Sequence, residues 1–522
     1  MDLVELSRVN AGECASLAAM VTRRGSVHGE IEARAPFTGA VLGIIPACQI
    51  EDVELAITRA RAAQAEWAAR SFATRADIFL RFHDLLLKRQ NEVLDLIQLE
   101  TGKARRNAFE EILDTAVVSR YYARRAEKLL RLRRRKGALP ILTRTWELRS
   151  PIGVVAFLVP WNFPLTLAIT DAIPALLAGN TAVLKPDPQT SFTALWAVNL
   201  LREAGLPQDV CCVVTGDGPL VGGALAERAD YVMFTGSTRT GRLVARQAAD
   251  RLIGCSLELG GKNPMIVLED ADLSDAVEGA IRGCFAGAGQ VCVSIERIYV
   301  HESLYAQFLA DFAKRTQALK LGAALDYSID MGSLTSERQL HTVEEHVRDA
   351  VEKGATLVSG GRRRPDLGPY FYEPTILGDV RPGMKVYAEE TFGPVVAVYS
   401  FANEDEAVAQ ANESPYGLNA SIWSRNTRRA LRLARRIQAG SINVNESYAA
   451  AWGSVDSPLG GWKESGLHPR HGAEGILKFT EAKTVAIQRW LPIGPAHGVD
   501  PATHARWMTR LVDWLRHLPL LG

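Results

Sequence analysis

The sequence predicts an α/β fold in which parallel strands alternate with helices and build more than one sheet. Short apolar runs of strand length recur along the chain, and segments with helical periodicity separate them. This alternating order favours parallel strands with helices on both faces, an architecture typical of nucleotide-binding proteins. The chain has 522 residues, of which 47% are apolar. At about 150 residues per domain, we expect two or three domains.

The composition excludes several classes of protein. Charged residues make up 23% of the chain and the formal net charge is +1, so no global attraction to nucleic acid or membranes is expected. The seven cysteines are sparse, odd in number and without metal-ligand spacing, which indicates free thiols, no metal and a reducing cytoplasm. Residues 15–21 do not fit a signal peptide. The apolar segment 153–184 contains prolines and asparagines, so we interpret it as strand, helix and strand rather than a membrane span.

The first third of the chain reads mainly as helix. Residues 51–88 and 91–130 show amphipathic helical periodicity. A basic run at 131–136 follows, and we interpret it as a solvated helix end rather than an anion-binding patch, because cations suit a helix C-terminus. Residues 141–158 are strand-like, and Ser150-Pro151 divides them as in a hairpin.

Two series of strands follow, and each predicts a separate α/β domain. The first series is expected at 154–158, 182–184, 210–214 and 231–234. The second is expected at 264–267, 297–300, 395–400 and 441–443. Near the C-terminus, residues 506–518 place tryptophan, methionine and leucine on one helical stripe with arginines beside it.

Three sites carry candidate chemistry, each with a plainer alternative. Thr235 to Gly241 follow an expected strand and precede a helix, as in a phosphate-binding turn, but the same residues could simply cap the helix. Cys292 follows small residues that leave room around its thiol, although a lone cysteine is usually a small buried hydrophobe. Glu258 lies between two leucines, where desolvation would raise its pKa toward that of a general base, or it is a salt-bridged structural acid.

Seven motifs, taken together, are far more specific. They are Pro160-Trp161-Asn162-Phe163-Pro164, Lys185-Pro186, Phe234-Thr235-Gly236-Ser237, Glu258-Leu259-Gly260-Gly261-Lys262, Gly289-Gln290-Val291-Cys292, Glu390-Thr391-Phe392-Gly393-Pro394, and Pro458-Leu459-Gly460-Gly461 with Lys463-Glu464-Ser465-Gly466. In this order they resemble the aldehyde dehydrogenase superfamily, from about residue 35 to about residue 485. The chain looks most like the branch named second-type succinate-semialdehyde dehydrogenase (NADP).

The resemblance implies a catalytic mechanism. Cys292 would attack the aldehyde carbon, and the Asn162 amide with the Cys292 backbone amide would stabilise the oxyanion. Hydride would pass to the nicotinamide of NAD or NADP, and Glu258 would activate water to hydrolyse the thioester. Members that transfer the acyl group to coenzyme A typically lack this glutamate, so the free acid is the expected product.

The resemblance also assigns the cofactor site. Lys185 would bind the adenosine ribose or its 2′-phosphate, and Gly236 with Ser237 would meet the pyrophosphate at a helix N-terminus. The remaining residues would contact the nicotinamide end or line its channel: Glu390, Phe392, Trp161 and Leu259. Many NAD-preferring members carry a glutamate where this chain has Pro188, so we expect NADP to be tolerated, with Asp187 acting against its 2′-phosphate.

The substrate is less well defined. Better-known succinate-semialdehyde enzymes hold the substrate carboxylate with two arginines, whereas this chain has Ala286 at one position and Thr170 and Asp171 at the other. A buried carboxylate without a cation is costly, so an uncharged or apolar aldehyde fits these positions at least as well. Tyr448 and Trp452 could form an aromatic box around it, or pack in the core near a subunit interface.

By resemblance the fold combines a Rossmann-type nucleotide-binding domain (1–130 and 151–257), a catalytic α/β domain (258–477) and a small β element for oligomerisation (131–150 and 478–490). The tail at 491–522 would pack on a neighbouring subunit, gate the substrate funnel or lie on a membrane surface. We expect a homodimer or homotetramer. The alternative functions are a catalytically idle binding or structural protein of this fold, and a thiol esterase that would leave the nucleotide motifs without a purpose.

Overall fold

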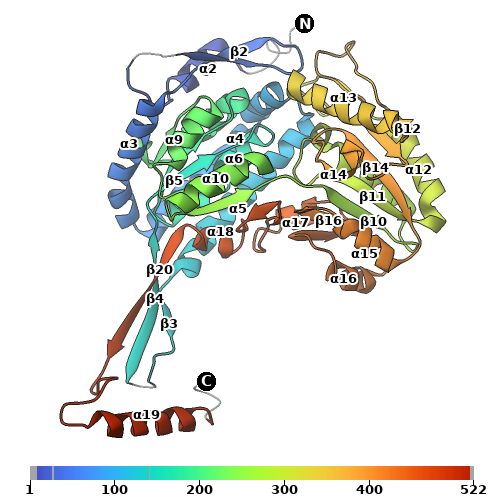
Figure 1. The fold of residues 1–522 in the computed structure, drawn as a ribbon. Coiled ribbons are helices and arrows are strands. Elements are labelled where there is room, and N and C mark those ends of the chain that lie inside the picture. Colours follow the sequence, from blue (N-terminus) through green and yellow to red (C-terminus); the bar gives the residue numbers. More distant parts are fainter. Residues whose placement is uncertain (1–8, 26–28, 140–141, 518–522) are drawn as a thin grey trace.

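The computed structural model describes residues 9–25, 29–139 and 142–517. Within these ranges it contains two large sheets, each covered by helices, and a three-stranded sheet that projects away from both (Figure 1). The expected parallel α/β fold is confirmed. No helix in the described ranges combines the length and apolarity needed to cross a membrane.

The first large sheet has the strand order β19-β9-β8-β5-β6-β7. Its strands are β5 (Val154–Leu158), β6 (Thr181–Lys185), β7 (Cys211–Val213), β8 (Tyr231–Thr235), β9 (Gly254–Glu258) and β19 (Gly466–Leu467). All pair in parallel except β19, which runs antiparallel to β9. The chain proceeds from β5 outward to β7 and then returns to β8 on the other side of β5. The carboxyl ends of β5 and β8 therefore form a topological switch point, where such sheets bind ligands.

Every residue of β5 and β6 is buried, because parallel strands are covered on both faces. The covering helices include α3 (Ile50–Ala69), α7 (Ala172–Leu177), α8 (Ser191–Glu203) and α10 (Thr238–Asp250). Two long helices, α4 (Phe72–Thr101) and α5 (Arg105–Leu130), pack on each other, and short α6 (Pro164–Ile169) packs on α5 and α8. The N-terminal part adds α2 (Ala11–Ala18), β1 (Glu30–Arg34) and β2 (Val41–Pro46).

The second large sheet has the order β12-β13-β14-β11-β10-β16-β17, and only β12 is antiparallel to its neighbour. Its strands are β10 (Asn263–Val267), β11 (Ile295–His301), β12 (Thr356–Ser359), β13 (Thr375–Gly378), β14 (Val395–Phe401), β16 (Asn419–Trp423) and β17 (Ser441–Val444). Its helices are α11 (Leu273–Phe285), α12 (Glu302–Gln317), α13 (Glu337–Glu352), α14 (Lys385–Ala388), α15 (Glu404–Asn412), α16 (Thr427–Ala434) and α17 (Ala449–Gly453). A short pair joins β15 (Tyr416–Gly417) to β18 (Trp462–Lys463).

Three expectations for the elements were wrong in detail. The first helix ends at Ala69, and Ser71 caps α4, which continues through Asn91 to Thr101 because the residues from Val93 onward are buried. The expected hairpin divided at Ser150-Pro151 does not form. Strand β4 (Thr143–Pro151) instead pairs with β20 (Thr480–Gln488) in the three-stranded sheet, whereas β5 belongs to the first large sheet. Ile141 lies outside the described residues.

The basic run is not a helix end. Helix α5 stops at Leu130, and Arg133–Arg135 form β3, which pairs antiparallel with β4. The Arg135 guanidinium binds the Glu147 carboxylate across these strands, a contact that local periodicity could not reveal. At the far end of this sheet lies α19 (Pro501–Leu515), which has no buried residue (Figure 1). The expected helix at 506–518 thus begins earlier, and Leu518 lies outside the described residues.

Candidate active site

The cysteine at position 292 lies in a tight loop between the two large sheets. It follows the 3-10 turn Ala286–Gly289, in which Gly287 and Gly289 have positive φ. A Cβ on Gly289 would lie 2.1 Å from the Gly393 carbonyl oxygen, so only glycine fits there. Burial and the nearby Glu258 carboxyl raise the pKa of the Cys292 thiol to about 12, while Arg470 acts in the opposite direction. The resting side chain is therefore a thiol, and a base must remove its proton during attack.

Asn162 lies against this loop. It follows the carboxyl end of β5 and is 6% exposed. Its Nδ2 donates a hydrogen bond of 3.1 Å to the Gln290 carbonyl, two residues before Cys292. The structure thus brings the expected amide donor and the expected nucleophile together, although 130 positions separate them in the sequence.

Glu258 ends β9 and faces the same loop. Its backbone pairs with Gly466 of β19, its side chain is buried, and its Oε1 has no hydrogen-bond partner. Burial raises the pKa of Glu258 to about 7, although Arg470 and Lys478 oppose the shift. A carboxyl group that titrates near neutrality and carries a free oxygen suits a general base. Gly460 lies beside it, and a Cβ there would be 3.2 Å from Glu258 Oε1.

A buried ion cluster behind Glu258 escaped the sequence analysis. The Arg470 guanidinium binds one carboxylate oxygen of Asp171, and Lys478 Nζ lies 3.5 Å from the other. All three side chains are at most 5% exposed. The position of Asp171 therefore has cations beside it. They are Arg470 and Lys478, which lie 299 and 307 residues away in the sequence. The Arg470 guanidinium also lies 5.7 Å from the centre of the Trp452 ring.

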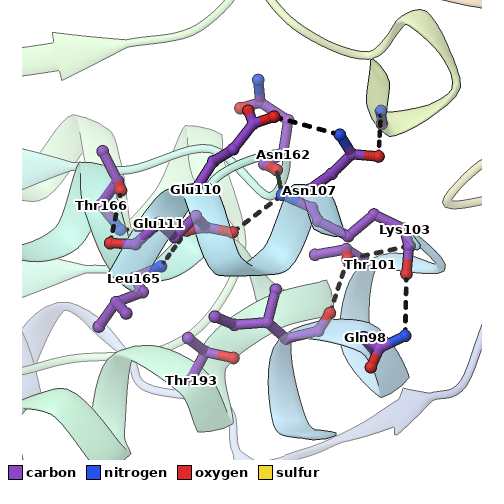
Figure 2. A network of polar contacts seen from close by, with 12 residues as sticks. Gln98, Thr101, Lys103, Asn107, Glu110, Glu111, Asn162, Leu165, Thr166 and Thr193 are labelled. Carbon is purple, nitrogen blue, oxygen red and sulfur yellow. Dashed lines mark hydrogen bonds and ion pairs between the residues drawn. The ribbon is translucent and has the colours of Figure 1, made fainter. Parts of the chain in front are cut away.

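A second buried network surrounds Asn162 and includes residues of α5 (Figure 2). Lys103 Nζ lies 2.8 Å from Glu111 Oε1 and donates a hydrogen bond of 2.6 Å to the Asn162 carbonyl. Glu111 Oε2 accepts hydrogen bonds from the backbone amides of Leu165 and Thr166 at 2.9 and 3.1 Å. No sequence motif pointed to these side chains. The only available signal was polar residues at helical spacing on a face that must be buried.

The pyrophosphate-binding candidates lie where β8 meets α10. Ser237 is the N-cap of α10, and its Oγ accepts a hydrogen bond from the Thr240 amide at 3.3 Å. A Cβ on Gly236 would lie 2.6 Å from the Phe234 ring, and one on Gly241 would lie 2.5 Å from Leu259 Cδ2. Both glycines are therefore needed for this close packing. The turn leaves the positive end of a 13-residue helix at the switch point of the sheet.

The ribose-binding candidates end β6. Lys185 is 6% exposed, and burial lowers its pKa while Asp187 and Asp217 act in the opposite direction. Asp187 caps the 3-10 turn that begins at Pro188, because its Oδ1 accepts a hydrogen bond of 3.0 Å from the Gln189 amide. One oxygen of that carboxylate is thereby occupied within its own turn.

Glu390 and Phe392, two of the residues expected to contact the nicotinamide end, precede β14 of the second large sheet. Glu390 contacts the loop of Gly260 and Gly261, which follows β9 of the first large sheet. Glu390 Oε1 accepts a hydrogen bond of 2.8 Å from the Gly261 amide, and a Cβ on Gly260 would lie 2.3 Å from Glu390 Oε2. The Phe392 ring packs edge-on to the Trp161 ring at 5.5 Å. The buried pair Lys262–Glu296 holds this segment, because Glu296 accepts hydrogen bonds from the Thr391 and Phe392 amides.

A model of the aldehyde dehydrogenase family matches residues 23–485, which is most of the chain. The chain belongs to the aldehyde dehydrogenase family. A relative from Mycolicibacterium smegmatis, named "Putative succinate-semialdehyde dehydrogenase (NADP+)", is 50% identical over 92% of this chain and 93% of its own length. The solved structure described as an E. coli NADP-dependent enzyme is 36% identical, with a TM-score of 0.85 over 88% of this chain and 95% of its own. An aldehyde dehydrogenase from Bacillus cereus in complex with NAD+ is 35% identical, with a TM-score of 0.84 over 88% of this chain and 93% of its own.

In this aldehyde dehydrogenase a cavity of about 320 Å³ opens beside the Cys292 loop. Tyr448 and Trp452 both line it, as expected for an aromatic box. The other lining residues are Glu110, Leu113, Asp114, Val117, Phe163, Thr166, Arg282, Val291, Val293, Ala449 and Gly453. Val291 and Val293, the sequence neighbours of Cys292, line it, so the cavity borders the Cys292 loop. Ala286 and Thr170 are buried, and among the described residues Arg282 is the one cation that lines the cavity.

Proposed function

We propose that this aldehyde dehydrogenase oxidises an aldehyde to its carboxylic acid through covalent intermediates on Cys292. The observation that supports the proposal is that the Asn162 amide binds the loop of Cys292, while the buried Glu258 is near enough to raise the pKa of the Cys292 thiol. The Cys292 thiol releases its proton to solvent water, and its sulfur adds to the carbonyl carbon to form a thiohemiacetal oxyanion. The Asn162 amide and the Cys292 backbone amide donate hydrogen bonds to that oxygen.

The acyl group then leaves by hydrolysis. Loss of hydride from the thiohemiacetal carbon gives a thioester, and NAD or NADP, when bound, accepts that hydride. Glu258 takes a proton from water, the hydroxide adds to the thioester carbon, and the acid departs while Cys292 recovers its proton. A buried glutamate whose pKa is about 7 supports this role at neutral pH.

The dinucleotide site is supported by the N-terminus of α10, which follows β8 at the switch point of the first large sheet. Lys185 would hold the adenosine ribose or its 2′-phosphate, Ser237 the pyrophosphate and Glu390 the nicotinamide ribose. Pro188 offers no carboxylate to repel a 2′-phosphate, and the name of the Mycolicibacterium smegmatis relative includes NADP+. We propose that both cofactors bind and that NADP is the preferred one.

For the substrate, the cavity favours an aldehyde without a carboxylate. Two carboxyl groups line it, Glu110 and Asp114, and both would repel an anion. Its one lining cation, Arg282, already binds the Glu446 carboxylate. Succinate semialdehyde is the second candidate, because the relatives carry its name and Arg282 stands at the cavity.

The test is a panel of aldehydes with either NAD or NADP, followed by the appearance of reduced nicotinamide. It includes succinate semialdehyde, aliphatic aldehydes of rising length and an aromatic aldehyde. We expect turnover that Cys292→Ala abolishes, with the uncharged aldehydes showing the higher kcat/KM. A preference for succinate semialdehyde that Arg282→Gln removes would establish the second candidate. No turnover by a folded wild-type protein that binds the dinucleotide would favour a catalytically idle role.

A further inference from the structure

One face of α5 and the turn before it carries buried polar side chains that the proposed chemistry does not use. Lys103 lies in the turn before α5, and Asn107, Glu110 and Glu111 lie in the first two turns of the helix. Lys103 is 3% exposed and Asn107 is 4% exposed, whereas Glu111 is fully buried. Charged groups are costly to bury, so each needs a compensating set of partners.

The partners of Lys103 and Glu111 lie in one short segment, residues 162–166. Lys103 donates to the Asn162 carbonyl at 2.6 Å, and its ammonium group lies 3.8 Å from the centre of the Phe163 ring. Glu111 accepts from the first free amides of α6, where a negative charge also suits the helix dipole. The ion pair therefore binds this segment at two places, the Asn162 carbonyl and the amides of Leu165 and Thr166 (Figure 2).

The same helix face also reaches the nucleophile loop. Asn107 Oδ1 accepts a hydrogen bond of 3.1 Å from the Gly287 amide. Asn162 Nδ2 then links the two loops through the Gln290 carbonyl. Since an oxyanion donor must be preorganised to within a fraction of an ångström, the segment that carries Asn162 needs such an anchor.

From these contacts we infer that Lys103 and Glu111 are positioning residues, which hold the Asn162 amide at the oxyanion site. Neither side chain lines the substrate cavity, so both act through Asn162 and not on the aldehyde. The inference rests on the proposed role of Asn162 in oxyanion binding.

The experiment compares Glu111→Gln, Asn162→Ala and the double variant with the wild-type holoenzyme. Glu111→Gln keeps the shape of the side chain but removes its charge. We expect kcat to fall about 10-fold or more while the KM for aldehyde changes little, because the lost interaction matters mainly in the transition state. A larger deuterium isotope effect with deuterated aldehyde should accompany this, because hydride loss becomes rate-limiting.

The double variant separates positioning from a general loss of structure. If Glu111 acts through Asn162, Glu111→Gln should lower kcat by less than about twofold in the Asn162→Ala background. In Glu111→Gln, the rate at which iodoacetamide alkylates Cys292 should match that of the wild type. Lys103→Arg keeps the charge and should retain more activity than Lys103→Met. This pair serves in place of Glu111→Gln if that variant does not fold.

The matched control is Asp95→Asn. Asp95 and Arg105 form another buried ion pair of α4 and α5, 2.6 Å apart, and Arg105 also binds Gln98 and the Leu325 carbonyl. This variant should lower the Tm and leave kcat unchanged. Equal effects of Glu111→Gln and Asp95→Asn on kcat, or independent effects of Glu111→Gln and Asn162→Ala, would overturn the inference. An unchanged kcat in Asn162→Ala would instead show that the proposed oxyanion site itself is wrong.

Discussion

At the scale of single residues, Glu258 has to be both buried and ionised. Its carboxyl group has no hydrogen-bond partner at Oε1, and burial favours the neutral form. Arg470 and Lys478 favour the charged form, but Asp171 binds both cations and weakens their field at Glu258. His471 is neutral, because burial and Arg470 lower its pKa to about 3. The base thus titrates close to neutral pH.

This environment predicts a pH dependence for deacylation. Glu258 must be deprotonated to act, so kcat should rise as the pH increases through about 7 and then level off. Glu258→Gln should lower steady-state kcat about 100-fold or more while the first equivalent of reduced nicotinamide still forms as a burst. A rapid-mixing experiment across pH measures both. A burst that disappears together with turnover would mean that Glu258 acts before the thioester forms.

Removal of Arg470 should move that pH dependence. Arg470→Gln deletes a cation beside Glu258, so the pKa of the glutamate rises and the acidic limb of kcat shifts to higher pH. Arg75→Gln is the control, because Arg75 is also 4% exposed but binds backbone carbonyls far from the site. The control should lose stability and keep its pH profile. An unmoved limb in Arg470→Gln would remove this arginine from the electrostatics of the base.

The sequence alone could identify Cys292, Glu258 and Asn162 only together, as members of ordered motifs. It could not find Arg470 or Lys103, because their partners are distant in sequence. The Arg470–Asp171 pair spans 299 positions, and Lys103 reaches Asn162 across 59. Neither contact leaves a local pattern, and a buried charge looks like a surface charge until the fold is known.

At the scale of elements, apolar runs predicted four strands of each large sheet, because a buried parallel strand is apolar on both faces. They did not predict β9 and β19 of the first sheet or β12, β13 and β16 of the second. Elements fixed by distant partners were predicted less well. The strand β3 is basic and pairs with β4, and the break after α3 precedes Ser71, which caps the start of α4. The expected boundary between nucleotide-binding and catalytic domains, at 257 and 258, stays a prediction. It falls at the end of β9. Strand β19, which lies in the expected catalytic part of the chain, pairs antiparallel with β9.

The contact between the loop after β9 and Glu390 makes a prediction about cofactor binding. Gly260→Ala would place a Cβ 2.3 Å from Glu390 Oε2, and that flexible side chain would have to leave its position. We expect a higher KM for the dinucleotide and a nearly unchanged Tm. Gly494→Ala, where a Cβ would meet nothing within 4 Å, is the control. Equal KM values for the two variants would argue against a role of Glu390 in holding the nicotinamide ribose.

At the scale of the whole molecule, the C-terminal tail adds little to the stability of this chain. Helix α19 has no buried residue, and Trp507 and Trp514 are 57% and 58% exposed. Deletion of residues 492–522 should therefore change the free energy of unfolding of the isolated chain by less than about 0.5 kcal/mol. Chemical denaturation measures this change in the free energy of unfolding. Light scattering and an activity assay of the truncated protein distinguish the expected uses of the tail. Loss of assembly would favour packing on a neighbour, and faster turnover of bulky aldehydes would favour gating.

The three-stranded sheet joins the body of the chain close to the Glu258 carboxyl group. Strand β20 begins at Thr480, two residues after Lys478, whose ammonium group lies near the Asp171 carboxylate behind Glu258. Farther along β20, Val485 and Ile487 are 39% and 48% exposed, an apolar ribbon that a second subunit would cover. If subunits associate there, mass action governs how firmly the strand is held. On dilution the subunits would then dissociate and the specific activity would fall. The reason is that β20, which the neighbouring subunit would hold in place, follows directly on Lys478, one of the cations that affect the charge of Glu258.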